Sequence, residues 1–195
     1  MIEYPFSIPF FSTYLEQDYL AGLRKDTRYT KSLTQKNPVY KYQGVFNILE
    51  RYPELRDKLL EEFNGFSYEL YGDVYGWKIG TSWITYTGKG DYIHEHGHDN
   101  YQWSGVLYFG DKYYNSVPLI FSNPLHKLFT YQHQFKAVNK LTCDWMVNPK
   151  PGLLVIFPSF VKHGTVKQQS SEIRYSMAFN IMPTKIIGGD SSLDI

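Results

Sequence analysis

The chain has almost no cysteine, no strong charge of either sign and no long apolar run. Its 195 residues include one cysteine, Cys143, so no internal disulfide can form. The formal net charge is +1, with 20 basic against 19 acidic residues, which gives no clear sign of a nucleic-acid partner. No stretch approaches the length of a membrane span, and the N-terminus lacks the pattern of a secretory signal. These absences predict a cytoplasmic protein of one domain over residues 1–195.

The first third of the chain predicts helices. The clearest one follows Pro53, with an apolar stripe that ends near Asn64-Gly65, a typical helix stop. Thr13 and Glu16 have the spacing of a capping box before another helix. We therefore expect a helical segment, residues 1–65, packed on a β-rich core over 66–183, with a frayed tail over 184–195. The stripe of the helix after Pro53 consists of Leu55, Leu59, Leu60 and Phe63.

The remainder of the chain predicts many short strands. Aromatic residues make up 18% of the sequence, and they favour pleated, half-buried surfaces. Short apolar runs alternate with turn residues, a pattern typical of a sandwich or jelly roll. The predicted strands are 67–71, 74–79, 82–87, 104–109, 117–121, 141–147, 153–157 and 173–181.

Three histidines fall within a short run, at positions 94, 96 and 98. Residues two apart on an extended strand point to the same face, so two of these imidazoles can share one metal ion. A fourth, His163, follows the apolar run 153–157 and a Phe157-Pro158-Ser159 turn. A histidine in that setting is by itself more often a hydrogen-bonded structural residue than a ligand.

The segment 173–181 alternates almost perfectly between apolar and polar or small residues. One face carries Arg174, Ser176, Ala178 and Asn180. That face is either turned to solvent or forms the floor of a carboxylate-binding pocket, because arginine binds a carboxylate with two parallel hydrogen bonds. The strand pattern alone does not choose between these two interpretations.

Together these segments resemble the iron(II)/2-oxoglutarate-dependent oxygenases, most closely a subgroup found in bacteria and phages. The subgroup pattern is a Gly-Asp-Tyr turn, His-x-His, Ser-Gly-x-x-Tyr, Phe-Pro-Ser, a histidine and Arg-x-Ser-x-x-Phe-Asn. The resemblance covers about residues 80–182. The matching positions are Gly90-Asp91-Tyr92, His96-Gly97-His98, Ser104-Gly105-Val106-Leu107-Tyr108, Phe157-Pro158-Ser159, His163 and Arg174-Tyr175-Ser176-Met177-Ala178-Phe179-Asn180.

The resemblance implies a mainly β protein with flanking N-terminal helices, built as a cupin-like double-stranded β-helix (jelly roll). It implies Fe(II), 2-oxoglutarate and O2 as cofactors and co-substrates, and hydroxylation of a substrate that the sequence does not identify. His96, His98 and His163 are the implied metal ligands, and Arg174 and Ser176 would bind the distal carboxylate of 2-oxoglutarate. Tyr108 would donate its hydroxyl to the same carboxylate, and Tyr86 and Asn180 are weaker candidates for the pocket wall.

The chain departs from many family members at one ligand position. They use His-x-Asp or His-x-Glu where this chain has His98, and an imidazole does not offset the charge of the metal as a carboxylate does. His94 is an alternative partner for His96, whereas Asp99 has the wrong spacing.

Two other functions remain open from the sequence. A cupin-like metalloenzyme with a three-histidine site would use no 2-oxoglutarate, and Arg174 would then have no carboxylate to bind. A non-catalytic jelly-roll module would carry its histidines on the surface, where they would neither converge nor hold a metal.

Overall fold

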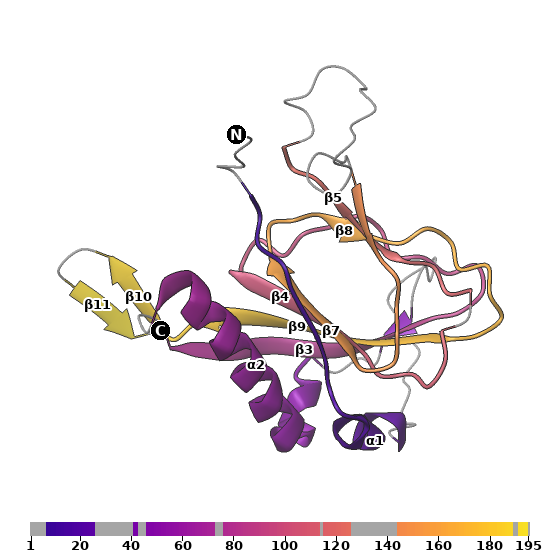
Figure 1. Ribbon diagram of the computed structural model, residues 1–195, viewed down its shortest axis with the longest axis horizontal. Coiled ribbons are helices and arrows are strands. Elements are labelled where there is room, and N and C mark those ends of the chain that lie inside the picture. Colours follow the sequence, from indigo (N-terminus) through magenta and orange to yellow (C-terminus); the bar gives the residue numbers. More distant parts are fainter. Residues whose placement is uncertain are drawn as a thin grey trace.

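Two antiparallel sheets face each other in the computed structural model, which describes residues 7–25, 41–42, 46–72, 76–113, 115–125, 144–188 and 191–194 (Figure 1). The larger sheet has the order β1-β7-β4-β9-β3-β2 and the smaller one the order β6-β5-β8. The predicted mainly β fold is confirmed. The strands of the larger sheet are β1 (Phe11–Tyr14), β2 (Lys41–Tyr42), β3 (Trp77–Thr87), β4 (Trp103–Tyr108), β7 (Leu153–Pro158) and β9 (Arg174–Pro183), and those of the smaller are β5 (Leu119–Ser122), β6 (Asp144–Val147) and β8 (His163–Gly164).

The helices lie against the outer face of the larger sheet, away from the smaller one (Figure 1). They are α1 (Gln17–Lys25), the 3-10 helix η1 (Ile48–Arg51) and α2 (Pro53–Tyr71). Their apolar side chains form one core cluster with the outward-facing residues of the sheet, among them Leu107, Met177 and Phe179. Of the helices that the structure describes, none has the length and apolar character needed to cross a membrane.

Helix α2 is longer than its sequence predicts. It continues through Asn64 and Gly65 to Tyr71 and ends at Gly72, whose φ of 69° suits glycine. The predicted stop at Asn64-Gly65 and the predicted strand 67–71 are therefore wrong. The physical reason is Phe66, whose ring packs on Phe11 and Trp103 with ring centroids 5.2 and 5.1 Å away, and this burial offsets the small cost of glycine within a helix.

Two other local predictions are wrong. The predicted strand 82–87 and the end of the predicted strand 74–79, from Trp77 on, form parts of one strand, β3, with a register shift between Ile79 and Thr81 in its pairing with β9. Residues 74 and 75 lie outside the described residues. Thr13 does not cap a helix, because it pairs with Leu154 as part of β1. Cys143 and the start of the predicted strand 141–147 lie outside the described residues.

The tail forms a small hairpin. β10 (Lys185–Gly188) pairs with β11 (Ser191–Asp194), and the hairpin projects beyond the end of the larger sheet (Figure 1). The predicted fraying of residues 184–195 concerns motion rather than pairing and stays a prediction.

Strand β9 lies at the centre of the larger sheet, between β4 and β3. Its residues Met177, Phe179 and Ile181 belong to the outer core cluster, while Arg174 and Asn180 line the space between the two sheets. Both polar side chains are buried. The solvent-facing interpretation of this polar face is therefore wrong, and the strand presents it to a pocket.

Candidate metal and co-substrate site

His96 and His163 meet across the protein although they are far apart along the chain. The backbone N–H of His96 donates to the carbonyl of His163 at 3.0 Å, and the N–H of His163 donates to the carbonyl of His96 at 2.9 Å. This pair of hydrogen bonds is an isolated antiparallel bridge. It fixes the relative positions of the two backbones that carry the imidazoles.

Glycine allows the two segments to approach so closely. A Cβ atom on Gly164 would lie 2.8 Å from the carbonyl oxygen of Ile93 and 3.0 Å from the amide nitrogen of Glu95. The same pairing continues at Thr165, which donates its N–H to the Ile93 carbonyl and accepts the Ile93 N–H at its hydroxyl, both at 2.9 Å. The histidine run therefore behaves as a further strand beside β8.

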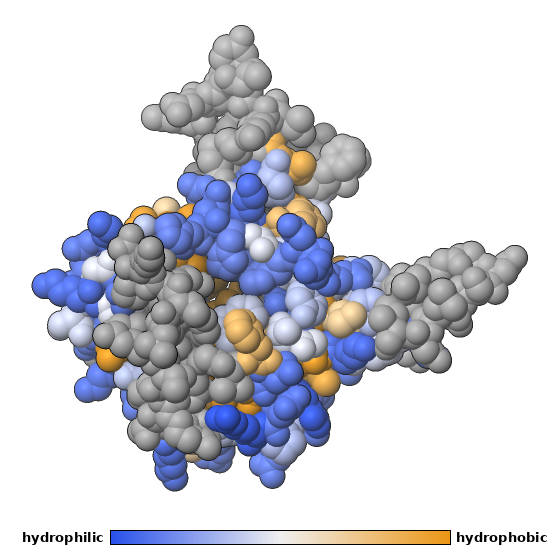
Figure 2. All heavy atoms as spheres, turned by 180° about the vertical axis from the view of Figure 1, so that it is seen from behind, coloured by the Kyte–Doolittle hydropathy of each residue, from blue (hydrophilic) through white to orange (hydrophobic). Residues whose placement is uncertain are grey.

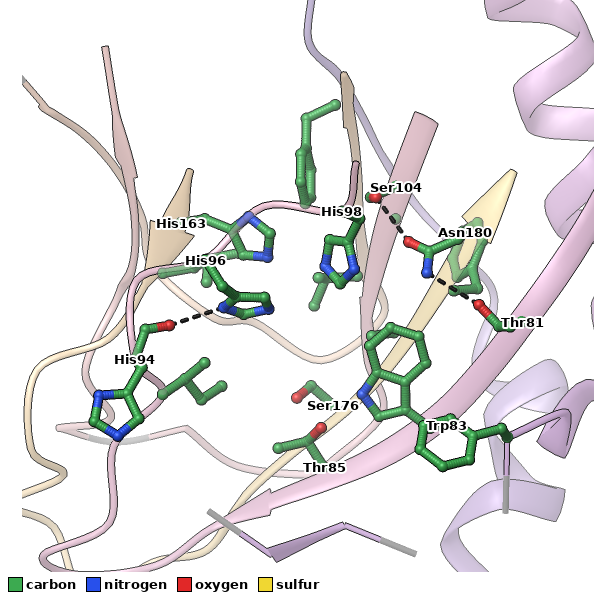
Figure 3. A pocket seen from close by; sticks show the side chains of 18 of the residues that line it. Thr81, Trp83, Thr85, His94, His96, His98, Ser104, His163, Ser176 and Asn180 are labelled. Atoms are coloured by element: carbon green, nitrogen blue, oxygen red, sulfur yellow. Dashed lines mark hydrogen bonds between the residues drawn. The ribbon is translucent and has the colours of Figure 1, made fainter. Parts of the chain in front are cut away.

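Three imidazoles converge at this bridge (Figure 3). The ring centroid of His96 lies 4.5 Å from that of His163 and 5.0 Å from that of His98, and the rings of His98 and His163 stack at 5.3 Å. One nitrogen from each ring lies within 4.8 Å of the other two, and among the described residues these three form a group that could hold a metal ion. Metal–nitrogen bonds are about 2.0–2.1 Å long, so small rotations of the rings bring all three to one ion.

Hydrogen bonds select the ring nitrogen that would be available to a metal ion. The Nδ1 atom of His96 lies 2.8 Å from the carbonyl oxygen of His94, and the Nδ1 atom of His163 lies 3.0 Å from that of Val161. A carbonyl oxygen only accepts, so each Nδ1 carries the proton and each Nε2 keeps its lone pair for a ligand.

The imidazoles of the buried His163 and the half-buried His98 are held neutral. Burial, followed by the proximity of His96, lowers the pKa of His163 from 6.5 to about 3 and that of His98 to about 4. Neutral imidazole is the form that binds a metal. These two imidazoles can therefore accept a divalent cation without losing a proton at neutral pH.

Arg174 is a buried cation in the same pocket. It is 1% exposed, its Nη2 donates to the hydroxyl oxygen of Tyr108 at 2.9 Å, and its Nε and Nη1 have no hydrogen-bond partner among the described residues. A buried charge without a counterion is costly. An anion bound to the two unpaired nitrogens would reduce this cost, so the guanidinium suits an anion-binding role. The hydroxyl of Tyr108 accepts from Arg174 and keeps its own proton to donate.

A cavity of about 560 Å³ joins the histidines to Arg174 and Ser176, a volume within the range of small-molecule sites. The hydroxyls of Ser176 and Thr85 lie beside one another on its wall (Figure 3), on residues paired in neighbouring strands. The two hydroxyls and the guanidinium can together surround one carboxylate.

Other predicted residues take different places. His94 lines the pocket but its ring points away from the three converging imidazoles (Figure 3), and Asp99 is exposed. Tyr86 does not reach the pocket: it lies in the outer core, 5.1 Å from the ring of Tyr175, and Thr85 lines the pocket instead. Asn180 lines the pocket, at its other end from Arg174.

Strand β3 supplies two hydroxyl-bearing wall residues, Thr81 and Thr85, that the sequence analysis missed. Thr81, Trp83 and Thr85 line the pocket, and the indole of Trp83 lies 5.7 Å from the ring of His98. Trp83 and Thr85 fall two residues apart within the predicted strand 82–87 and so share a face, a signal that could have revealed them. Thr81 lies in the predicted break between the two strands.

Sequence and structure comparisons both lead to one group of proteins. A family model described as "Putative 2OG-Fe(II) oxygenase" matches residues 81–180, whereas no curated protein matches the chain. The carbocyclase SnoK from nogalamycin biosynthesis, described as non-heme and alpha-ketoglutarate dependent, is 13% identical with a TM-score of 0.65, covering 91% of this chain and 81% of its own.

Two further solved structures are similar. HygX from Streptomyces hygroscopicus, solved with nickel and 2-oxoglutarate bound, is 12% identical with a TM-score of 0.61, covering 91% of this chain and 84% of its own. A Pseudomonas putida prolyl-4-hydroxylase is 15% identical with a TM-score of 0.58, covering 90% and 94%. At these identities the likeness concerns the fold, and it confirms the predicted double-stranded β-helix.

Proposed function

Because this chain belongs to the 2OG-Fe(II) oxygenases, which use iron(II), 2-oxoglutarate and O2, we propose that it hydroxylates a C–H group of a primary substrate. In the balanced reaction, substrate, 2-oxoglutarate and O2 give the hydroxylated product, succinate and carbon dioxide. The iron, when bound, supplies the activation of O2, and the protein supplies binding, orientation and exclusion of water.

Three residues are proposed to hold the iron: His96, His98 and His163. The support is their convergence within 4.8 Å and the protonated Nδ1 atoms of His96 and His163. Three neutral ligands leave the metal charge uncompensated, so an anionic co-substrate gains more electrostatic attraction here than beside a carboxylate ligand.

A single observation carries the co-substrate part of the proposal: the guanidinium of Arg174, whose Nε and Nη1 have no partner among the described residues, lines the same pocket as the histidines. We propose that Arg174 and Ser176 bind the distal carboxylate of 2-oxoglutarate and that Tyr108 donates its remaining proton to it. A charge-assisted pair of this kind orients the five-carbon chain along the pocket towards the histidines. A three-histidine metalloenzyme without 2-oxoglutarate would leave this buried cation without a function.

The test is anaerobic titration of the protein with iron(II) and 2-oxoglutarate, followed by visible absorption spectroscopy, and then a succinate assay after admission of air. We expect a charge-transfer band and succinate formation, both lost in Arg174→Ala. Metal uptake with neither the band nor succinate would overturn the 2-oxoglutarate assignment, and a chain that takes up no metal would overturn both parts.

A further inference from the structure

The inner face of the larger sheet is arranged in four layers of paired residues. β9 contributes one residue to each layer, and β3 and β4 contribute its neighbours. From one end to the other the layers are Arg174 with Thr87; Ser176 with Thr85 and Tyr108; Ala178 with Trp83 and Val106; and Asn180 with Thr81 and Ser104. The pocket therefore changes in character along the direction of β9.

The two outer layers are too far apart to share one small co-substrate. Arg174 and Asn180 are six residues apart on one strand, which is about 20 Å at a rise of about 3.3 Å per residue. The four C–C bonds of 2-oxoglutarate, each about 1.5 Å long, span about 6 Å at most. If Arg174 holds its distal carboxylate, Asn180 faces a different molecule.

Among the described residues, no lysine, arginine, aspartate or glutamate lines the Asn180 end of the pocket. Among the described residues that line the pocket, Arg174 is the sole lysine, arginine, aspartate or glutamate. Once 2-oxoglutarate occupies Arg174, no side chain of that set remains to neutralise a charged substrate, and burying an unpaired charge is costly. The group that enters this end is therefore uncharged.

A directed chain of hydrogen bonds crosses this end of the pocket. The hydroxyl of Ser104 donates to Oδ1 of Asn180 at 2.8 Å, and Nδ2 of Asn180 donates to the hydroxyl oxygen of Thr81 at 3.0 Å. Ser159 must then donate to Ser104, 2.8 Å away. The chain leaves the proton of Thr81 and the second N–H of Asn180 as spare donors, which suit hydroxyl or ether oxygens of a ligand.

A flat aromatic wall stands beside these donors. The indole of Trp83 lies next to the ring of His98 (Figure 3). Its partner on β9 is Ala178, whose small side chain leaves space in the pocket beside the indole. The exposed ring of Phe46 lies 6.4 Å from the indole and extends the wall towards the pocket mouth. An aromatic face binds an apolar ring face, while the neighbouring donors bind polar groups at the rim of the ring.

We propose that the Asn180 end of the pocket binds an uncharged, hydroxyl-bearing ring of the primary substrate, sugar-like in its chemistry, against Trp83 and the donors of Asn180 and Thr81. This inference rests on the proposed function, because it assigns Arg174 to 2-oxoglutarate. It removes Asn180 from the co-substrate contacts and makes it a determinant of substrate specificity.

The experiment is calorimetric titration of the protein loaded with nickel(II) and 2-oxoglutarate, using nine matched probes. These are the methyl pyranosides of glucose, mannose and galactose, the three corresponding uronic acid glycosides and the three amino sugar glycosides. We expect at least one neutral probe to bind at least tenfold more tightly than its acidic and basic counterparts. Asn180→Asp should weaken that neutral probe tenfold or more and favour the amino counterpart, and Trp83→Ala should abolish binding of the neutral probe.

Matched controls separate this inference from the proposed function. Asn64→Asp places the same charge on the exposed surface of α2, and Trp145→Ala removes an indole from β6 outside the pocket lining; both should bind the probes as the natural chain does. The 2-oxoglutarate titration that precedes each experiment tests the proposed function by itself. If 2-oxoglutarate binds but no neutral probe does, or charged probes bind equally well, the inference is wrong and the proposed function stands.

Discussion

The two faces of β9 are equally buried but are made of opposite chemistry. On the outer face Met177, Phe179 and Ile181 are completely buried among apolar side chains. On the inner face Arg174 and Asn180 are at most 3% exposed, yet two nitrogens of the arginine lack partners in the part of the chain that the structure describes. Burial of the outer face stabilises the fold, whereas burial of the arginine costs stability until a ligand arrives. Burial therefore does not identify a core residue, and on β9 it is the unpaired nitrogens of Arg174 that distinguish the site from the core.

The largest expected effect comes from removing the inner-face cation. Arg174→Leu should weaken 2-oxoglutarate binding by about 100-fold or more, since charge-assisted hydrogen bonds contribute about 1.5–3 kcal/mol each. Its melting temperature should be unchanged or higher, because an unpaired buried charge is replaced by an apolar group. Calorimetry with the nickel-loaded protein and a thermal melt measure the two quantities. A strongly destabilised variant would contradict the contrast between the two faces, and Arg174→Lys should bind 2-oxoglutarate with intermediate affinity.

The complementary change is made on the outer face. Met177→Ala should lower the free energy of unfolding by about 2–5 kcal/mol, the usual cost of a cavity in a packed core. Binding of 2-oxoglutarate by the folded fraction should remain within about threefold of the natural chain, which is about 0.6 kcal/mol. Urea denaturation and calorimetry provide the measurements. If the binding free energy for 2-oxoglutarate fell by more than the free energy of unfolding, the two faces of β9 would not be separable.

Acid should destabilise the metal-free protein through the histidines. Burial lowers the pKa of His163 to about 3 and that of His98 to about 4, while in the unfolded chain both protonate near 6.5. The unfolded state therefore binds more protons below pH 6.5, and stability that is present above this value is lost as the pH falls towards 4 and then 3.

Melting temperatures of the metal-free protein between pH 7 and 5 measure this effect, in a window above most carboxyl titrations. The double variant His98→Gln, His163→Gln should show a flatter profile over the same window. An equally steep fall in the variant would assign the effect to other groups.

The smallest expected effect concerns the phenol that joins the guanidinium to the carboxylate site. Tyr108→Phe removes the acceptor of the Arg174 Nη2 hydrogen bond and the donor proposed for 2-oxoglutarate. One neutral hydrogen bond contributes about 1 kcal/mol, so the affinity for 2-oxoglutarate should fall about threefold to tenfold in calorimetry. No change would place the carboxylate away from Tyr108.

The sequence indicated the site better than it indicated the helical layer. The alternation around Arg174 and Ser176 and the spacing of His96 and His98 are local patterns, and a strand preserves them because residues two apart share a face. The convergence of His96 with His163 depends on pairing between distant segments, and the motif order supplied it only through the resemblance to a family.

The wrong predictions for α2 and β3 also arise from contacts between distant segments. Gly65 is a helix-stop signal that the aromatic contacts of Phe66 override, and the continuity of β3 is maintained by its pairing with β9 across a register shift. Neither contact can be read from neighbouring residues. Trp83 and Thr85 share a face within one predicted strand, but the apolar–polar alternation is interrupted at Ser82 and Trp83, and Thr81 fell in a predicted break between two strands.

The antiparallel bridge between His96 and His163 also has a consequence for folding. Its two hydrogen bonds join parts of the chain that become neighbours only when a long intervening segment has closed, and such non-local pairings form late. The cluster of three converging imidazoles should accordingly be missing from early folding intermediates. Metal uptake during refolding would then mark the completion of the double-stranded β-helix, and metal binding would not nucleate its folding.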